Sequence, residues 1–178
     1  MNALRAPILL IPAAGEPADG WHRLADALTA NGAPVTLIDA RADEAFEARV
    51  RRVRDALAAL GRPAVLVGHH GGGAVMTAAA TRRSAAHLIY VAGEMPDYGE
   101  TVTDNVTPIG AVAWRAVPST YVLCARDRRF PLAAQQRVAE LRATTIARID
   151  AGDDVATTHA EALAQIVRED AAAEPYAS

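Results

Sequence analysis

The chain contains a single cysteine, Cys124, and no lysine, because all 18 of its basic residues are arginines. One cysteine excludes an internal disulfide and is typical of proteins from a reducing compartment, so we expect a cytoplasmic location. Without lysine, the chain cannot form a Schiff base with a carbonyl substrate. The bias toward arginine and alanine also indicates a GC-rich bacterial source.

Long apolar segments and clusters of basic residues are also missing. Pro12 interrupts the short apolar run near the N-terminus, so we expect no signal peptide. No segment approaches the roughly 20 apolar residues of a transmembrane helix. The net charge is −3. These absences argue against a membrane or nucleic-acid partner and favour a soluble protein that handles a small organic molecule.

Apolar segments alternate with amphipathic ones along all 178 residues, of which 51% are hydrophobic. We therefore expect a single domain over residues 1–178. The pattern predicts strands at residues 7–12, 34–39, 64–67, 87–92, 120–125 and 145–149. It predicts helices at residues 21–31, 43–60, 72–82, 132–142 and 157–169. This alternation is typical of an α/β fold with a doubly wound, mostly parallel sheet in three α/β/α layers.

The most informative segment follows the third expected strand and reads Gly68-His69-His70-Gly71-Gly72. Glycines on both sides of a central residue indicate a sharp strand-to-helix turn that holds this residue in a strained backbone conformation. His70 occupies the centre of the turn. His69 precedes it and is expected to pack beside the sheet.

This turn and its surroundings give the chain a resemblance to the α/β-hydrolase superfamily, in particular to its small esterases and hydroxynitrile lyases. The segments that carry the resemblance are residues 8–39, 66–75, 88–100, 118–127 and 149–164. The turn is similar to the nucleophile elbow of that superfamily, G-x-S-x-G. The resemblance implies a minimal α/β-hydrolase fold.

The resemblance also implies roles for individual residues. His70 stands at the nucleophile position and Asp127 at the position of the triad acid. The backbone N–H groups of Ala14 and Gly71 stand where the superfamily places its oxyanion donors, with His69 next to them on the substrate-binding side.

The sequence departs from the superfamily's pattern at several places. His70 replaces the serine nucleophile, and Asp153, which follows Gly152, stands where the triad histidine belongs. Pro12-Ala13 replaces the His-Gly after the first strand. Only about 25 residues separate the strands between which the superfamily inserts a helical cap, so we interpret residues 93–118 as a residual cap loop.

These departures predict that the protein is not a serine-type hydrolase, since acyl transfer needs a hydroxyl nucleophile and a histidine base. An imidazole at position 70 with a carboxylate at Asp127 or Asp153 instead suits lyase, isomerase or cyclase chemistry. The alternative is a catalytically silent protein that binds a ligand or a partner subunit, such as a second copy in a homodimer.

Two further interpretations follow from the same residues. One histidine and two carboxylates (His70, Asp127 and Asp153) resemble a facial iron site, but no local ligand spacing supports it, so we expect neither a metal nor another cofactor. His159 lies at the start of the last expected helix, where we expect a structural role.

Overall fold

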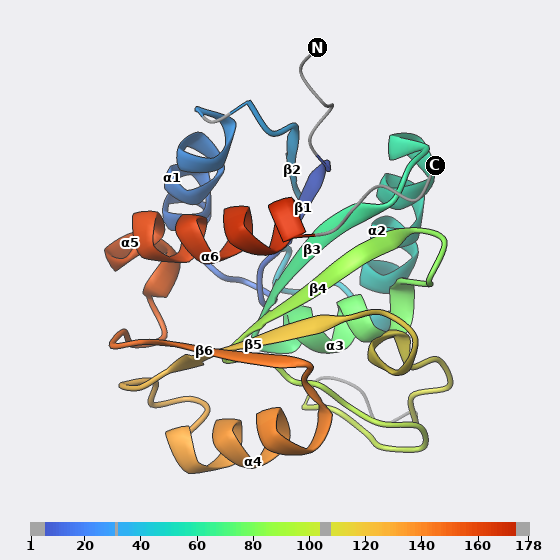
Figure 1. The fold of residues 1–178 in the computed structure, drawn as a ribbon. Coiled ribbons are helices and arrows are strands. Elements are labelled where there is room, and N and C mark those ends of the chain that lie inside the picture. The colour runs from blue at the N-terminus through green and yellow to red at the C-terminus, as the bar shows by residue number, and fades with distance from the viewer. Residues whose placement is uncertain (1–5, 31, 104–107, 174–178) are drawn as a thin grey trace.

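The computed structural model describes residues 6–30, 32–103 and 108–173. Within these residues a sheet of six parallel strands lies between layers of helices (Figure 1). The strands are β1 (Ile8–Ile11), β2 (Val35–Leu37), β3 (Ala64–His69), β4 (Ala85–Val91), β5 (Ser119–Cys124) and β6 (Thr145–Ile149). The helices are α1 (Ala18–Thr29), α2 (Phe46–Leu60), α3 (Gly71–Ala79), α4 (Leu132–Arg142), α5 (Val155–Thr158) and α6 (Ala160–Ala173), with a 3-10 turn, η1 (Ala113–Arg115).

The strand order is β2-β1-β3-β4-β5-β6, so the chain begins inside the sheet and winds outward in both directions. The register of β1 against β3 pairs Ile11 with Gly68, and that of β3 against β4 pairs His69 with Val91. The carboxyl ends of these parallel strands therefore meet at one edge of the sheet. Ligand sites of doubly wound sheets lie at this edge, near the point where the winding direction changes.

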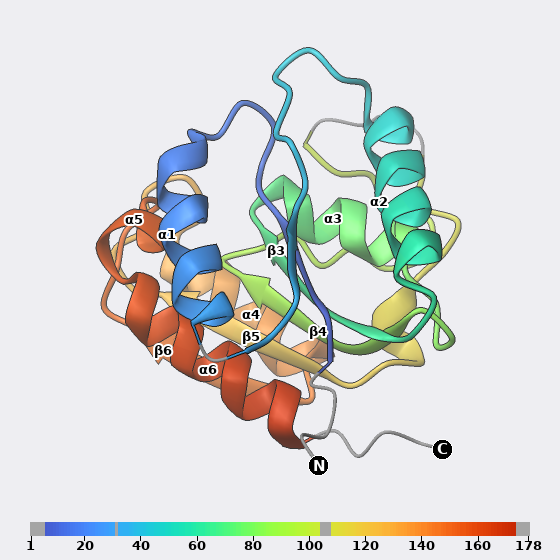
Figure 2. The same cartoon turned by 90° about the horizontal axis from the view of Figure 1, so that it is seen from above.

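The helices cover both faces of the sheet and complete the three α/β/α layers predicted from the sequence. Helices α2, α3 and α4 pack on one face, and α1, α5 and α6 on the other (Figure 2). Strands β1 and β3 are buried along their whole length, which explains their nearly unbroken apolar sequences.

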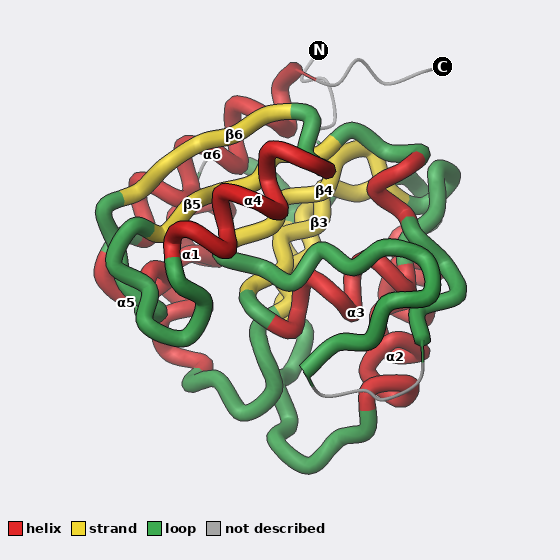
Figure 3. Tube along the Cα trace, turned by 90° about the horizontal axis from the view of Figure 1, so that it is seen from below, coloured by secondary structure: helices red, strands yellow, loops and turns green. Residues whose placement is uncertain are grey.

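The connection between β4 and β5 runs as a long loop beside α3 (Figure 3). Its described residues contain η1 and no α-helix. Ile109 and Ala113 are buried in the same core as α3, and the indole N–H of Trp114 donates to the carbonyl of Pro96 at 2.8 Å. The described part of this connection is thus attached to the body of the domain.

Several helix boundaries differ from the sequence prediction, among them the end of α3, which stops at Ala79 and not at residue 82, and the end of α6, which extends to Ala173. The expected helix 157–169 is two helices, because His159 (φ −133°) interrupts the helical backbone between α5 and α6. Helix α1 begins three residues early, directly after Pro17, and α2 begins three residues late, which leaves residues 43–45 in a loop. No helix among the described residues is long and apolar enough to cross a bilayer.

Candidate active site

The turn between β3 and α3 has the strained geometry that its glycines predict. His70 has φ 43° and ψ −121°, a region that side chains with a Cβ rarely adopt. A Cβ on Gly72 would lie 2.1 Å from the carbonyl oxygen of Ile11, and one on Gly68 would lie 2.8 Å from the backbone of Gly73. Glycine is needed at both positions because β1 and the first turn of α3 pack against the turn itself.

His70 is held by Asp127, which lies in the turn after β5. The Nε2 atom of His70 lies 2.7 Å from Oδ2 of Asp127, and both side chains are buried. The backbone N–H groups of Arg129 and Phe130 each donate to Oδ1 of Asp127 at 2.8 Å. Both oxygens of this carboxylate thus accept hydrogen bonds.

These hydrogen bonds determine which nitrogen of His70 carries the proton. Burial alone would raise the pKa of Asp127, but the hydrogen bonds from His70 and from the backbone of Phe130 outweigh it and lower this pKa. An ionised carboxylate only accepts, so Nε2 of His70 is protonated and donates. The opposite nitrogen, Nδ1, is buried and has no hydrogen-bond partner among the described residues.

The buried ring of His69 packs against the ring of His70. The two rings are stacked with centroids 3.8 Å apart and planes inclined by 25°. The Nδ1 atom of His69 lies 2.8 Å from Oε1 of Glu16, and the N–H of Ala13 donates to Oε2 of Glu16 at 2.9 Å. Burial lowers the pKa of His69 in spite of this carboxylate, which favours the neutral form of the ring.

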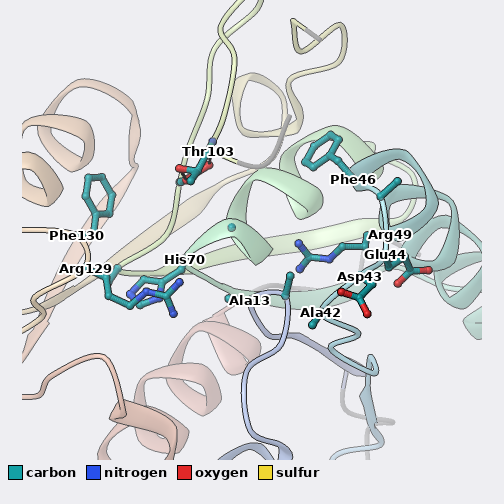
Figure 4. A pocket seen from close by; sticks show the side chains of 15 residues that line it. Ala13, Ala42, Asp43, Glu44, Phe46, Arg49, His70, Thr103, Arg129 and Phe130 are labelled. Carbon is teal, nitrogen blue, oxygen red and sulfur yellow. Dashed lines mark hydrogen bonds between the residues drawn. The ribbon is translucent and has the colours of Figure 1, made fainter. Parts of the chain in front are cut away.

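A cavity of about 680 Å³ opens at the carboxyl edge of the sheet above this pair (Figure 4). Its lining comes from the loops after β1, β2, β4 and β5 and from the starts of α2 and α3: Ala13, Ala14, Ala42, Asp43, Glu44, Ala45, Phe46, Arg49, His70, Gly71, Ala92, Glu94, Thr103, Arg129 and Phe130. The backbone N–H groups of Ala14 and Gly71 donate to no other described residue. They therefore remain available to an oxygen atom of a ligand.

No family model matches the chain, and no curated protein matches its sequence. Solved structures do resemble it. The pyrethroid hydrolase PytH has a TM-score of 0.80 over 94% of this chain and 98% of its own, at 18% identity. A methylesterase from Arabidopsis has a TM-score of 0.77 over 94% and 99% of the two chains, at 17% identity. Tomato methylketone synthase I, complexed with 2-tridecanone, has a TM-score of 0.79 over 96% and 99%, at 12% identity.

This chain has the α/β-hydrolase fold. At these identities the likeness concerns the fold and not the activity. In the α/β-hydrolase fold the strained turn that enters the helix after a central strand is the nucleophile elbow. His70 is therefore the elbow residue of this chain, and Asp127 follows β5, which is separated from β3 by β4 and ends at the same edge of the sheet.

The structure does not bring Asp153 to this pair. Asp153 is exposed in the turn between β6 and α5, and it is not one of the described residues that line the cavity. The neighbouring Asp154 is the residue before α5, so this turn serves to start a helix. His159 also lies away from the cavity, and its Nδ1 atom is 2.8 Å from the hydroxyl of Thr158.

The facial iron set is therefore incomplete without Asp153, and the remaining cluster is poorly arranged for one ion. Donor atoms of His69, His70 and Asp127 lie within 4.8 Å of one another. A metal binds in the plane of each imidazole, about 2.0–2.1 Å from the nitrogen. Two ring planes inclined by only 25° with centroids 3.8 Å apart intersect far beyond that bond length. The stacked rings cannot share an ion in this arrangement.

Sequence reasoning missed three side chains of the site. Glu16 holds His69, Arg49 donates from Nη2 to the carbonyl of Pro12 at 2.9 Å, and Arg129 lines the cavity beside His70. The only signal for Arg129 was its place two residues after Asp127. Glu16 and Arg49 belong to a loop and a helix whose approach to the elbow depends on tertiary packing.

Proposed function

We propose that this protein catalyses a non-hydrolytic proton-transfer reaction on a small organic molecule, as a lyase, isomerase or cyclase, with His70 as the acid/base group. The observation that carries the proposal is the 2.7 Å hydrogen bond between His70 and Asp127 at the elbow, beside a cavity of about 680 Å³.

The arrangement assigns a task to each group. Ionised Asp127 orients the ring and holds a proton on Nε2, which leaves Nδ1 as the basic nitrogen. When a base removes a proton next to a carbonyl, negative charge develops on the carbonyl oxygen, and backbone N–H groups stabilise it. The N–H groups of Ala14 and Gly71 suit that role. His70 offers no hydroxyl for an acyl-enzyme, which disfavours ester hydrolysis by the serine mechanism.

The fold is compatible with such a reaction. One of the structures of similar fold is named a synthase, whereas the other two are named a hydrolase and an esterase. Different chemistries can occupy one fold because function resides in the site.

A second candidate function is a catalytically silent protein that binds a ligand or a partner subunit. The burial of His70 Nδ1 favours it, since a substrate could reach this nitrogen only after the imidazole turned toward the cavity. In that case the hydrogen bond to Asp127 stabilises the elbow, and the cavity binds a ligand without changing it.

Deuterium exchange distinguishes the two candidates without knowledge of the substrate. A panel of small ketones and carboxylic acids is incubated in D2O with the wild-type protein, with His70→Gln and with His22→Gln, and the masses are measured. His22 is exposed on α1 and serves as the matched control, whereas glutamine at position 70 retains a donor for Asp127. We expect deuterium incorporation or a new product with the wild type and with His22→Gln, and neither with His70→Gln. Exchange that persists in His70→Gln, or is absent throughout, contradicts catalysis by His70.

A further inference from the structure

We propose that the cavity binds its ligand through a carboxylate group, held by the guanidinium of Arg129 and the backbone N–H groups of Gly71 and Ala14, so that the ligands of this site are small monocarboxylic acids. The inference rests on the same site as the proposed function and names its ligand class.

The backbone of Arg129 is held by the carboxylate that also holds His70, and the Arg129 side chain is exposed to solvent. Its backbone N–H donates to Oδ1 of Asp127 at 2.8 Å, while His70 Nε2 lies 2.7 Å from Oδ2 of the same group. The Arg129 side chain then extends along the cavity wall next to His70 (Figure 4). A ligand that approaches His70 therefore meets this guanidinium.

The guanidinium of Arg129 makes no hydrogen bond or ion pair with any residue in the described ranges. The nearby Arg126, by contrast, pairs with Asp150 at 3.3 Å. A guanidinium presents parallel N–H donors that match both oxygens of a carboxylate, and such charge-assisted pairs are the stronger hydrogen bonds in proteins.

The backbone adds donors at the same end of the cavity. Gly71 is the first residue of the nine-residue helix α3, whose N-terminus carries partial positive charge. Its N–H and that of Ala14 lack acceptors among the described residues, whereas the neighbouring N–H of Ala13 is already bound by Glu16. Asp127 lies beneath His70 with its side chain fully buried. Glu94 also lines the cavity, and its carboxylate accepts hydrogen bonds from the backbone N–H and the hydroxyl of Thr103.

The opposite end of the cavity limits the ligand to one such group. Asp43 and Glu44 lie there with Arg49, at a distance from Arg129 and His70 (Figure 4). Glu44 has one oxygen paired with Arg52 at 2.6 Å and the other, Oε2, buried without a partner among the described residues. Arg49 and Arg52 balance the charges of Asp43 and Glu44, and Arg49 already donates to the carbonyl of Pro12, so this end offers no surplus positive charge to a second ligand carboxylate.

Binding of benzoate and benzamide tests the inference, because the two molecules have nearly the same shape and differ in charge. The full chain is labelled with 15N, and the amide signals of Gly71 and Ala14 are followed during titration. We expect benzoate to shift both signals saturably, with a Kd about tenfold lower than that of benzamide, as loss of one charge-assisted contact would predict.

Substitution of the arginine isolates its contribution. Arg129→Gln keeps the backbone N–H that binds Asp127 and should weaken benzoate binding about tenfold without changing benzamide binding. Arg128→Gln is the matched control, because Arg128 is exposed like Arg129 but does not line the cavity. The inference would be overturned if neither probe bound, if the two probes bound with equal affinity, or if Arg129→Gln left benzoate binding unchanged. It would also be overturned if benzoate shifted only amide signals away from Gly71 and Ala14.

The outcome can be separated from that of the proposed function, because binding requires no turnover. Benzoate binding through Arg129 without any deuterium exchange would support the carboxylate site and contradict acid/base catalysis. Deuterium exchange that depends on His70 in a protein that does not prefer benzoate would support catalysis and contradict the carboxylate site.

Discussion

Replacing Asp127 should reveal how strongly the elbow depends on its buried carboxylate. Asp127→Ala removes the acceptor of His70 Nε2 and of the backbone N–H groups of Arg129 and Phe130. The His70 donor stays buried without a partner and the two backbone donors, which are partly buried, lose theirs, so we expect a loss of about 3–5 kcal/mol in the free energy of unfolding. Asp127→Asn retains an oxygen for the two backbone donors and weakens only the contact with His70, which predicts a loss of about 1–2 kcal/mol.

The stability that the Asp127 variants lose should depend on pH. The native pKa of Asp127 lies below that of an unfolded aspartate, which is about 3.9. The carboxylate therefore contributes its full stabilisation above about pH 4, and this contribution is lost as the pH falls through the native pKa. The stability difference between the wild type and Asp127→Asn should be constant near neutral pH and should narrow in acid.

Equilibrium unfolding in urea, followed by the fluorescence of buried Trp21, measures these differences. Asp153→Ala is the control, because Asp153 is exposed and its replacement should change stability by less than about 0.5 kcal/mol. A loss below about 1 kcal/mol in Asp127→Ala, or equal losses in the alanine and asparagine variants, would refute the assigned hydrogen-bond roles.

Two further substitution and labelling experiments test the packing around the elbow. Gly72→Ala places a Cβ 2.1 Å from the carbonyl oxygen of Ile11 and should destabilise the protein by about 3 kcal/mol or more, whereas Gly110→Ala, whose Cβ meets nothing within 4 Å, should be nearly neutral in the same unfolding assay. Equal effects of the two would contradict the close approach of β1 to the turn. Burial raises the pKa of the Cys124 thiol to about 12, so iodoacetamide at pH 8 should label Cys124 only after unfolding, and rapid labelling of the native protein would contradict this burial.

The fold was predictable because its signals are local. Each predicted strand is present with ends within two residues of those observed, since buried parallel strands are short apolar runs bounded by turn residues. The errors lie where tertiary contacts decide. Residues 43–45 continue the sequence pattern of α2 but form part of the cavity wall instead, and His159 interrupts a segment that reads as one helix.

The candidate site was predictable only in part. The elbow motif located His70, and the resemblance located Asp127, which the structure places 2.7 Å from it. Asp153 lies outside the site. Its predicted place there depended on aligning it with the triad histidine of the superfamily, a residue that this sequence lacks at that position. The contact between the Glu16 carboxylate and His69 could not be predicted from the sequence, since Glu16 belongs to a loop whose path depends on packing against the elbow.

The strained turn at position 70 has a consequence for substitution at this site. The backbone of His70 is held by contacts that its side chain does not make: its carbonyl accepts the N–H groups of Gly73 at 3.0 Å and Glu94 at 2.9 Å. The positive φ costs roughly 1–3 kcal/mol for any residue with a Cβ, so a serine and an imidazole bear a similar penalty. The backbone of the turn therefore tolerates other side chains at position 70: a replacement there changes the reactive group and keeps these backbone hydrogen bonds, and what it loses is the side-chain contact with Asp127.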